Sequence, residues 1–181
     1  MDISSLEKNI TDNIKEAQIK LGYDPMPMSL NYMLSSLNSL LGTELTAAEM
    51  AESLRGFETE HLGKITSRPI KDGLCLTIPA EGTAYVNGLM EGYEFITELI
   101  SAVRGHSSSV EDIIEIFRRY SDDVRVEECR SGDFDYLVHF AGGVPDGYFY
   151  CLTEEPCMNG ECHVIYHRFI PSDYNALFKC D

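Results

Sequence analysis

The chain has 181 residues, of which 44% are hydrophobic and 24% are charged, and its thirty acidic and fourteen basic side chains give a formal net charge of −16 at pH 7. A chain of this length buries enough surface to fold as one domain or two small ones without a metal or a disulfide. Its acidity opposes binding to nucleic acids and to anionic membranes, which attract Lys and Arg. No apolar run approaches the roughly 20 residues of a membrane span.

The N-terminus begins an amphipathic pattern at once and lacks the charged start and apolar core of a signal peptide. We therefore expect a cytoplasmic protein without membrane association. In a reducing cytosol its six cysteines are expected to be thiols and not disulfides. No cofactor is expected.

The first sixty residues predict three short helices. Residues 4–21 form the first, with Ser4 and Glu7 as a capping box and Gly22 as its stop. Its apolar face carries Leu6, Ile10, Ile14, Ala17 and Leu21. The second helix follows Pro27 and carries Leu30, Met33, Leu34, Leu37 and Leu41 on one side. Thr46 and Glu49 predict a capping box before the third, which extends to about Phe57.

Short β-prone segments follow at residues 65–70, 74–78 and 83–86, separated by Pro and Gly. In this order of elements, residues 28–104 resemble a winged-helix domain. The segment TAAEMAESLRGF resembles the first half of a helix-turn-helix, and DGLCLTIPAEGTAYV resembles a wing hairpin. The whole chain also resembles an uncharacterised bacterial protein family.

The recognition helix implied by this resemblance would lie at residues 58–63, which are acidic and interrupted by Gly63. A helix that contacts bases usually presents Arg, Lys, Asn or Gln. A winged helix used for docking proteins suits this composition better. A DNA-binding regulator would instead need one basic patch, formed by Arg55, Lys64, Arg68 and Lys71.

The second half predicts helices at residues 91–104 and 110–120, the latter capped by Ser109 and Asp112, and then four antiparallel strands between residues 124 and 170. The predicted fold class is therefore α+β, with an N-terminal helical, winged-helix-like half followed by two helices and a four-stranded antiparallel sheet. The expected regions are residues 1–90 and 91–181, packed as one domain or standing as two.

The first predicted hairpin turns at residues 131–133. This register pairs Arg130 with Phe134, Val126 with Val138, and Val124 with Phe140, and gives one clean apolar face. On the opposite face we expect His139 to be a solvent-side histidine.

The second predicted hairpin turns at Asn159-Gly160, the strongest local turn signal in the chain. This register pairs Cys157 with Cys162, Glu155 with Val164, Thr153 with Tyr166, and Leu152 with His167. Tyr150 and Phe169 then become cross-strand neighbours.

Two cysteines and two histidines gather in this hairpin, but regular strand geometry places them on different faces. No metal site is favoured. The alternatives are a zinc site at Cys157, Cys162 and His163 if Pro156 ends the pairing early, and a disulfide between the two cysteines; ordinary thiols are expected first.

Catalytic residues cannot be assigned. Cys162 and His163 are adjacent and so point apart on a strand, and any other Cys-His pair would have to be made by the fold. The sequence contains no phosphate-binding glycine loop or nucleophile elbow. We therefore expect a non-catalytic protein-interaction or regulatory protein, with a protein as its partner. The alternative is a small-molecule-binding or hydrolytic domain with its site on an aromatic sheet face. That candidate face consists of Tyr136, Tyr148, Tyr150, Tyr166 and Phe169.

Overall fold

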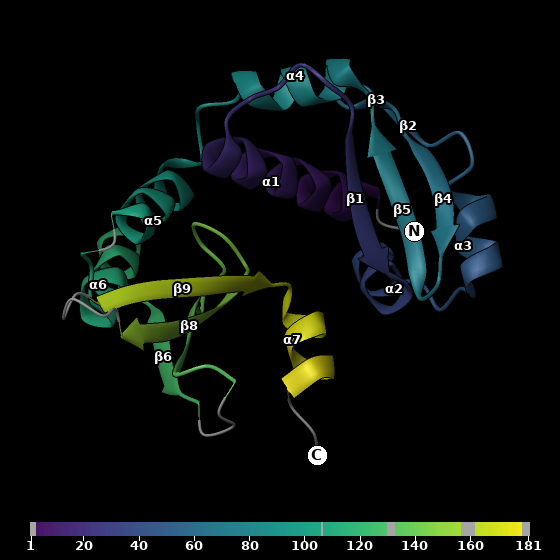
Figure 1. Cartoon of the computed structure of the whole chain (residues 1–181). Coiled ribbons are helices and arrows are strands. Elements are labelled where there is room, and N and C mark those ends of the chain that lie inside the picture. Colours follow the sequence, from purple (N-terminus) through teal and green to yellow (C-terminus); the bar gives the residue numbers. More distant parts are fainter. Residues whose placement is uncertain (1–2, 106, 130–132, 157–161, 179–181) are drawn as a thin grey trace. The chain divides into compact units, whose positions relative to one another are not determined.

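The computed structural model describes residues 3–105, 107–129, 133–156 and 162–178, and the chain divides into two compact units, Met1–Leu89 and Met90–Asp181 (Figure 1). Both units combine helices with antiparallel strands. The predicted α+β class is confirmed.

The first unit contains a three-stranded antiparallel sheet in the order β1-β5-β4 and a short β2-β3 pair (Figure 1). Its elements in chain order are α1 (Ile3–Leu21), β1 (Met28–Met33), α2 (Leu34–Leu41), α3 (Ala47–Ser53), β2 (Glu58–Thr59), β3 (Gly63–Lys64), β4 (Thr66–Ile70), β5 (Gly73–Ile78) and α4 (Ala80–Gly88).

The core of this unit follows from the helical period of α1. Leu6, Ile10 and Ile14 recur at intervals of four residues, so they share one face, and all three are fully buried. They join the buried Leu37 of α2 and Leu76 of β5 in one cluster. Each such side chain contributes about 1.5–3 kcal/mol when it is fully removed from water.

Three sequence predictions for this unit were wrong. Residues 28–33 form a strand and not the start of a helix, because alternate side chains of β1 turn inward and its backbone pairs with β5 from Met28 opposite Ile78 to Met33 opposite Gly73. Residues 83–86 belong to α4 and not to a wing strand. The predicted recognition helix at 58–63 is instead occupied by β2, a turn and the start of β3.

The second unit is built on a four-stranded antiparallel sheet in the order β6-β7-β8-β9, which confirms the predicted sheet. Its elements are α5 (Glu94–Arg104), α6 (Val110–Tyr120), β6 (Val124–Glu128), β7 (Tyr136–Phe140), β8 (Phe149–Pro156), β9 (Cys162–Phe169) and α7 (Pro171–Phe178).

Helices pack on both faces of this sheet. From α5 and α6, Phe95 and Phe117 contact the Tyr150 ring edge-on, at centroid distances of 5.7 and 5.1 Å. On the opposite face, Tyr174 of α7 contacts Phe149 at 5.4 Å. The second face thus has its own hydrophobic cluster. On this face the ring of His139 packs against that of Phe149, at a centroid distance of 4.5 Å. His139 lies on the predicted face, opposite α5 and α6, but it is half-buried there and not fully in solvent.

The first hairpin has the predicted register. Val124 pairs with Phe140 and Val126 with Val138. The predicted pair of Arg130 with Phe134 cannot be compared, since Arg130 lies outside the described residues.

The second hairpin is shifted by one residue from its predicted register. Glu155 pairs with His163, Thr153 with Ile165, and Leu152 with Tyr166, where Val164, Tyr166 and His167 were predicted. Since side chains alternate along a strand, the shift moves each predicted partner to the opposite face. Tyr150 therefore lies opposite Arg168, and Phe169 lies opposite Phe149. The predicted neighbours Tyr150 and Phe169 do not share a face.

Two of the three predicted capping boxes are confirmed. The side chains of Thr46 and Ser109 accept bonds from the backbone N–H groups of Glu49 and Asp112, whose carboxylates accept in return. Ser4 is different, because the described part of α1 begins at Ile3 and already includes Ser4 within the helix.

Candidate binding site

The structure does not bring the five residues of the predicted aromatic face together. Tyr136, Tyr150 and Tyr166 share the face covered by α5 and α6, where Tyr150 is fully buried and Tyr166 is 8% exposed. The Tyr148 ring, also 8% exposed, contacts the Arg168 guanidinium at 4.2 Å. Phe169 packs on the other face, against Phe134 and Phe178. These side chains are largely taken up by packing.

The hydroxyl of Tyr150 has a structural role. It donates to a carboxylate oxygen of Asp146 at 2.6 Å, and the other carboxylate oxygen of Asp146 accepts from the backbone N–H of Tyr148 at 3.1 Å. A buried phenol needs such a partner, since an unpaired hydroxyl in the core is costly.

The predicted zinc alternative falls largely outside the described residues, which include neither Cys157 nor the side chain of Cys162. His163 lies on β9 opposite Glu155 and is half-buried. Among the described side chains, no group of three or more His, Cys, Asp and Glu could hold a metal ion.

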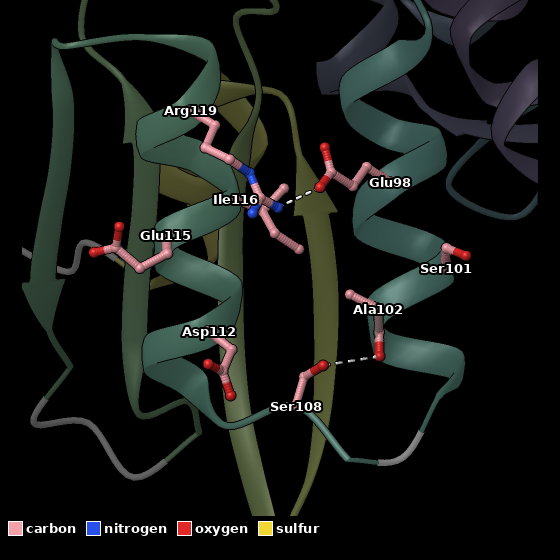
Figure 2. Close-up of a pocket in the computed structure, with 8 residues that line it drawn as sticks. All are labelled: Glu98, Ser101, Ala102, Ser108, Asp112, Glu115, Ile116 and Arg119. Atoms are coloured by element: carbon pink, nitrogen blue, oxygen red, sulfur yellow. Dashed lines mark hydrogen bonds and ion pairs between the residues drawn. The ribbon is translucent and has the colours of Figure 1, made fainter.

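A polar groove of about 470 Å³ lies between α5 and α6 (Figure 2). Its charged groups already have partners within the unit. Arg119 pairs with Glu98, the Asp112 carboxylate accepts from Ser109, and Glu115 pairs with Arg118. The Arg119–Glu98 pair links the two helices across this groove, and the charged side chains named here are already engaged within the unit.

A second cavity, of about 440 Å³, lies at the C-terminal end of α1 in the first unit. We refer to it as the Gln18 pocket. It is lined by Ala17, Gln18, Leu21, Gly22, Asp24, Met26, Pro27 and Met28.

Local sequence explains how this pocket forms. Gly22 ends α1 with a φ of +90°, which favours glycine, and its N–H donates to the Gln18 carbonyl at 2.9 Å. The following segment turns back through a bond from the Met26 N–H to the Asp24 carbonyl, at 2.8 Å. It then enters β1 after Pro27. The segment thus folds over the end of α1.

Thr83 of α4 fixes both walls of the pocket. Its hydroxyl lies within donating distance of two carbonyls, those of Met26 at 3.0 Å and Ala80 at 2.9 Å, and its own carbonyl accepts from Nε2 of Gln18 at 2.8 Å. Thr83 is fully buried. The loop and the helix end are therefore positioned by one residue.

The amide oxygen of Gln18 is unusual, although it is buried within the protein and not exposed to the pocket. Gln18 is 7% exposed, and its buried Oε1 has no hydrogen-bond partner among the described residues. The orientation of the amide follows from the Thr83 carbonyl, because exchanging the two ends would set two acceptors against each other. A buried acceptor without a partner costs about 1–3 kcal/mol, so its presence requires an explanation.

The rim of the pocket is apolar and exposed. Leu21 is 87% exposed and Met26 is 60% exposed, while Asp24 also lies at the surface. The C-terminal end of the 19-residue α1 carries a partial negative charge, as does any helix end of this kind. The pocket therefore combines apolar walls, a carboxylate and a negative helix end.

One turn earlier on α1, backbone carbonyls bind the ammonium group of Lys15. Lys15 is 8% exposed, and its Nζ donates to the carbonyls of Val86, at 3.4 Å, Asn87, at 3.1 Å, and Leu89. These carbonyls lie at the end of α4, which favours a cation. Burial lowers the pKa of Lys15 below its usual value.

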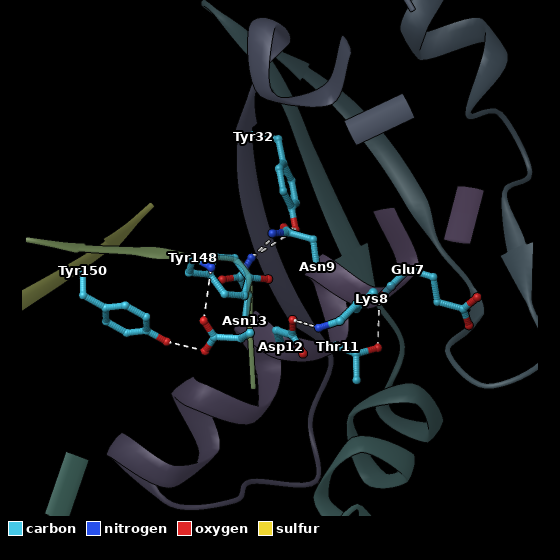
Figure 3. A network of polar contacts seen from close by, with 10 residues as sticks. Glu7, Lys8, Asn9, Thr11, Asp12, Asn13, Tyr32, Tyr148 and Tyr150 are labelled. Atoms are coloured by element: carbon cyan, nitrogen blue, oxygen red, sulfur yellow. Dashed lines mark hydrogen bonds and ion pairs between the residues drawn. The ribbon is translucent and has the colours of Figure 1, made fainter. Parts of the chain in front are cut away.

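A polar cluster fixes the middle of α1 against β1 (Figure 3). The Tyr32 hydroxyl donates to Oδ1 of Asn9 at 2.8 Å, and Nδ2 of Asn13 donates to the same oxygen at 2.9 Å. On the neighbouring turn, Lys8 pairs with Asp12 at 2.6 Å. These contacts hold the helix whose last turn lines the Gln18 pocket.

Sequence reasoning missed this pocket, although one signal pointed to it. Leu21 continues the apolar stripe of α1 and was predicted to lie on its buried face. It is instead the stripe residue left most exposed. An apolar stripe that continues to the glycine stop, followed by two prolines and two methionines, is the available sequence signal. Thr83, which contacts both Gln18 and the Met26 loop, is more than sixty residues from Gln18 in the sequence, and no sequence signal pointed to it.

A family model described as "Domain of unknown function, E. rectale Gene description (DUF3877)" matches residues 3–178. No curated protein and no solved structure matches the chain. No helix in the described part of the chain combines the length and the apolar character needed to cross a membrane.

Proposed function

The chain belongs to the DUF3877 family, a domain of unknown function, and from its structure we propose that it is a non-catalytic interaction protein that docks a partner protein at the Gln18 pocket. The observation that carries this proposal is the cavity at the end of α1, whose rim exposes the apolar side chains of Leu21 and Met26. Docking sites typically combine a pocket for an anchoring side chain with a rim that excludes water.

The negative charge of the chain and of the pocket indicates which kind of partner segment would bind. The chain carries a net charge of −16, and the pocket itself holds Asp24 and the negative end of α1. Such a surface attracts a basic segment and repels an acidic one. We therefore assign the pocket to a partner segment that is both basic and apolar.

The topology of the first unit supports a docking role. With the short β2-β3 pair left aside, the succession α1, β1, α2, α3, β4, β5, with β5 between β1 and β4, resembles the arrangement of a winged-helix domain. In this alignment α3 takes the place of the recognition helix, and it exposes Glu49 and Glu52 with no Lys or Arg within its bounds. An acidic helix of this kind favours a protein partner over DNA.

The test is affinity capture from the cytosol of the native organism, with wild-type protein and with Leu21→Asp and Met26→Asp variants. Val144→Asp is the matched control, since Val144 is an apolar residue, 67% exposed, that does not line the pocket. We expect a basic partner protein that the wild type and the control retain and both pocket variants lose. An identical set of captured proteins from all four would refute the proposal.

A further inference from the structure

The two larger sheets of this protein have four edge strands, β1 and β4 in the first unit and β6 and β9 in the second (Figure 1). Edge strands are commonly protected against further pairing by charged side chains or by proline. β4 carries Arg68 and Pro69, β6 carries Arg125, and β9 carries Arg168. β1, with the sequence MSLNYM, carries neither a charged residue nor a proline. Its edge is therefore the one most open to an added strand.

The register of β1 shows which of its backbone groups face this open edge. The Leu34 N–H, one position beyond the last β1–β5 pair, donates to the Asp72 carbonyl at 3.0 Å. In an antiparallel ladder, hydrogen-bonded pairs alternate with pairs that are not bonded, so Ser29 and Asn31 fall at positions that do not bond to β5. The hydroxyl oxygens of Ser29 and its partner Thr77 lie 2.8 Å apart, which fits the closer side chains of a non-bonded pair.

The backbone N–H and C=O groups of Ser29 and Asn31 therefore point away from β5, toward the open edge. Both residues are exposed, and no described residue outside the sheet bonds to these groups. We infer, on the basis of the docking function proposed above, that the partner binds here as an extended segment that adds one strand to the sheet beside β1. The added strand gives the partner segment a conformation that the docking function alone leaves open.

The open edge begins at the Gln18 pocket. Met28 is the first residue of β1, and it also lines the pocket together with Met26 and Pro27. A segment that places an apolar side chain in the pocket can therefore continue directly along β1. In complexes of this kind, main-chain hydrogen bonds supply affinity and pockets for side chains supply specificity.

The two faces of β1 determine the composition of the added strand. Met28 and Leu30 pack against the core cluster of the first unit, whereas Ser29 and Asn31 are exposed on the opposite face. Side chains that lie directly beside them on an added strand share these faces. Apolar and polar residues should therefore alternate along the partner segment.

The charge of the chain favours a basic segment at this edge over a second copy of the same chain. Asp24, four positions before β1, lies at the surface, and the net charge of −16 attracts basic side chains at the polar positions of the segment. A second copy would bring the same negative charge, and its β1 contains no basic residue. The segment is thus expected to alternate apolar and basic residues.

The probe is an acetylated and amidated peptide of sequence KVKVKV, titrated into the full chain and followed by NMR at the backbone amides. The acidic peptide EVEVEV is the charge-reversed comparison. At saturation with KVKVKV, we expect hydrogen exchange at the Ser29 and Asn31 amides to slow at least about tenfold. The Val126 amide is the internal control, because the bond from the Ala141 N–H to the Asp123 carbonyl places it at the open edge of β6.

Two N-methylated forms of the peptide test main-chain pairing. In antiparallel addition, the lysines share the face of Ser29 and Asn31, so their N–H groups bond to β1 and the valine N–H groups face solvent. N-methylation of the lysines should therefore weaken binding at least about tenfold, and N-methylation of the valines less than about twofold. Binding through side chains alone would respond equally to both modifications.

Asn31→Pro tests the same edge from the side of this protein. It removes an N–H that faces the open edge and leaves the β1–β5 hydrogen bonds in place, which an edge strand tolerates. We expect it to weaken KVKVKV binding at least about tenfold. Val126→Pro makes the matched change on β6 and should leave binding unchanged. Urea denaturation verifies that both variants are folded.

No saturable binding of KVKVKV at millimolar concentration, equal binding of EVEVEV, or equal effects of the two N-methylated forms would overturn the inference. So would a dimer, measured by sedimentation, that Asn31→Pro dissociates, because a second copy would then occupy the edge. Partner capture that depends on Leu21 and Met26 but not on Asn31 would leave the docking proposal standing without the added strand. Capture that depends on Asn31 alone would keep the added strand and remove the pocket from the docking function.

Discussion

Gln18 and Thr83 are joined by a 2.8 Å hydrogen bond that determines which end of the Gln18 amide is left without a partner. The Thr83 carbonyl takes the NH₂ group, so the oxygen remains. The same Thr83 hydroxyl holds the loop that faces this end of α1. One buried threonine thus contacts both the loop and the helix end, and it fixes the orientation of the Gln18 amide.

The approach of α4 to the β2–β3 turn depends on Gly82. A Cβ at this position would lie 2.5 Å from the Leu62 carbonyl oxygen, closer than van der Waals contact allows. Since a backbone atom cannot yield cheaply, we expect Gly82→Ala to lower the free energy of unfolding by about 2 kcal/mol or more. The free energy of unfolding of the variant and of the wild type is measured by urea denaturation.

Gly88→Ala is the control for Gly82→Ala, because Gly88 lies at the end of the same helix and no atom would lie within 4 Å of its new Cβ. This substitution should be neutral or stabilise by a fraction of 1 kcal/mol through higher helix propensity. Equal destabilisation by the two substitutions would contradict the proposed close approach.

The buried ammonium of Lys15 is expected to stabilise the first unit. Lys15→Met keeps most of the aliphatic stem but leaves the carbonyls of Val86, Asn87 and Leu89 without this donor. We expect a loss of about 1–2 kcal/mol, measured by chemical denaturation. Lys20→Met, which removes the ion pair with Glu16 on the same helix, should cost less than about 0.5 kcal/mol. A smaller effect at Lys15 than at Lys20 would show that the carbonyls do not need the ammonium.

The two capping boxes predict how stability depends on acid. Bonds from Thr46 and Ser109 hold the pKa values of Glu49 and Asp112 below their ordinary values of 4.5 and 3.8. The unfolded chain therefore binds these protons more readily, so the stabilisation is complete above these ordinary values and is lost as the pH falls through the folded-state pKa values. Glu49→Ala and Asp112→Ala should each flatten the acid limb of a stability-against-pH curve, compared with the control Glu111→Ala. Parallel stability curves for all three variants and the wild type would contradict the predicted contribution of these two carboxylates.

The thiol of Cys151 is expected to be inert in the folded protein. Cys151 is fully buried, and burial, together with the nearby Cys129, raises the pKa of its thiol to about 12. Because the thiolate is the reactive form, alkylation at neutral pH should require unfolding. Peptide mapping after brief treatment with N-ethylmaleimide should find Cys151 unmodified in the native protein and modified in urea. Modification at equal rates would show that this side of the sheet opens readily.

Local patterns predicted most of the elements but not the pairings that involve distant segments. The apolar stripe of Leu6, Ile10 and Ile14 predicted α1. The pairs Thr46-Glu49 and Ser109-Asp112 predicted where α3 and α6 begin. Each of these signals lies within one or two helical turns of the chain. The strand β1 was missed because the residues of β5 with which it pairs are 40 to 50 positions away in sequence. Its apolar spacing is also compatible with a helix.

The second hairpin shows a different limit. Asn159-Gly160 predicted a two-residue loop, yet the last described pair joins Pro156 to Cys162. A shift of one residue changes no local preference, but it reverses which side chains share a face. The aromatic face was therefore assembled from residues of opposite faces, with Tyr150 on one and Phe169 on the other. The Gln18 pocket depends on Thr83, whose approach to α1 has no local signature.

The most direct test of the docking proposal is hydroxyl-radical footprinting of the complex between the wild-type protein and the partner identified by capture. Met26 and Met90 are both well exposed in the free chain, at 60% and 78%, and both side chains oxidise readily when solvent reaches them. A partner that docks at the Gln18 pocket should protect Met26 from oxidation and leave Met90 at its free rate. Oxidation of Met26 at the same rate in the complex as in the free protein would contradict docking at this site.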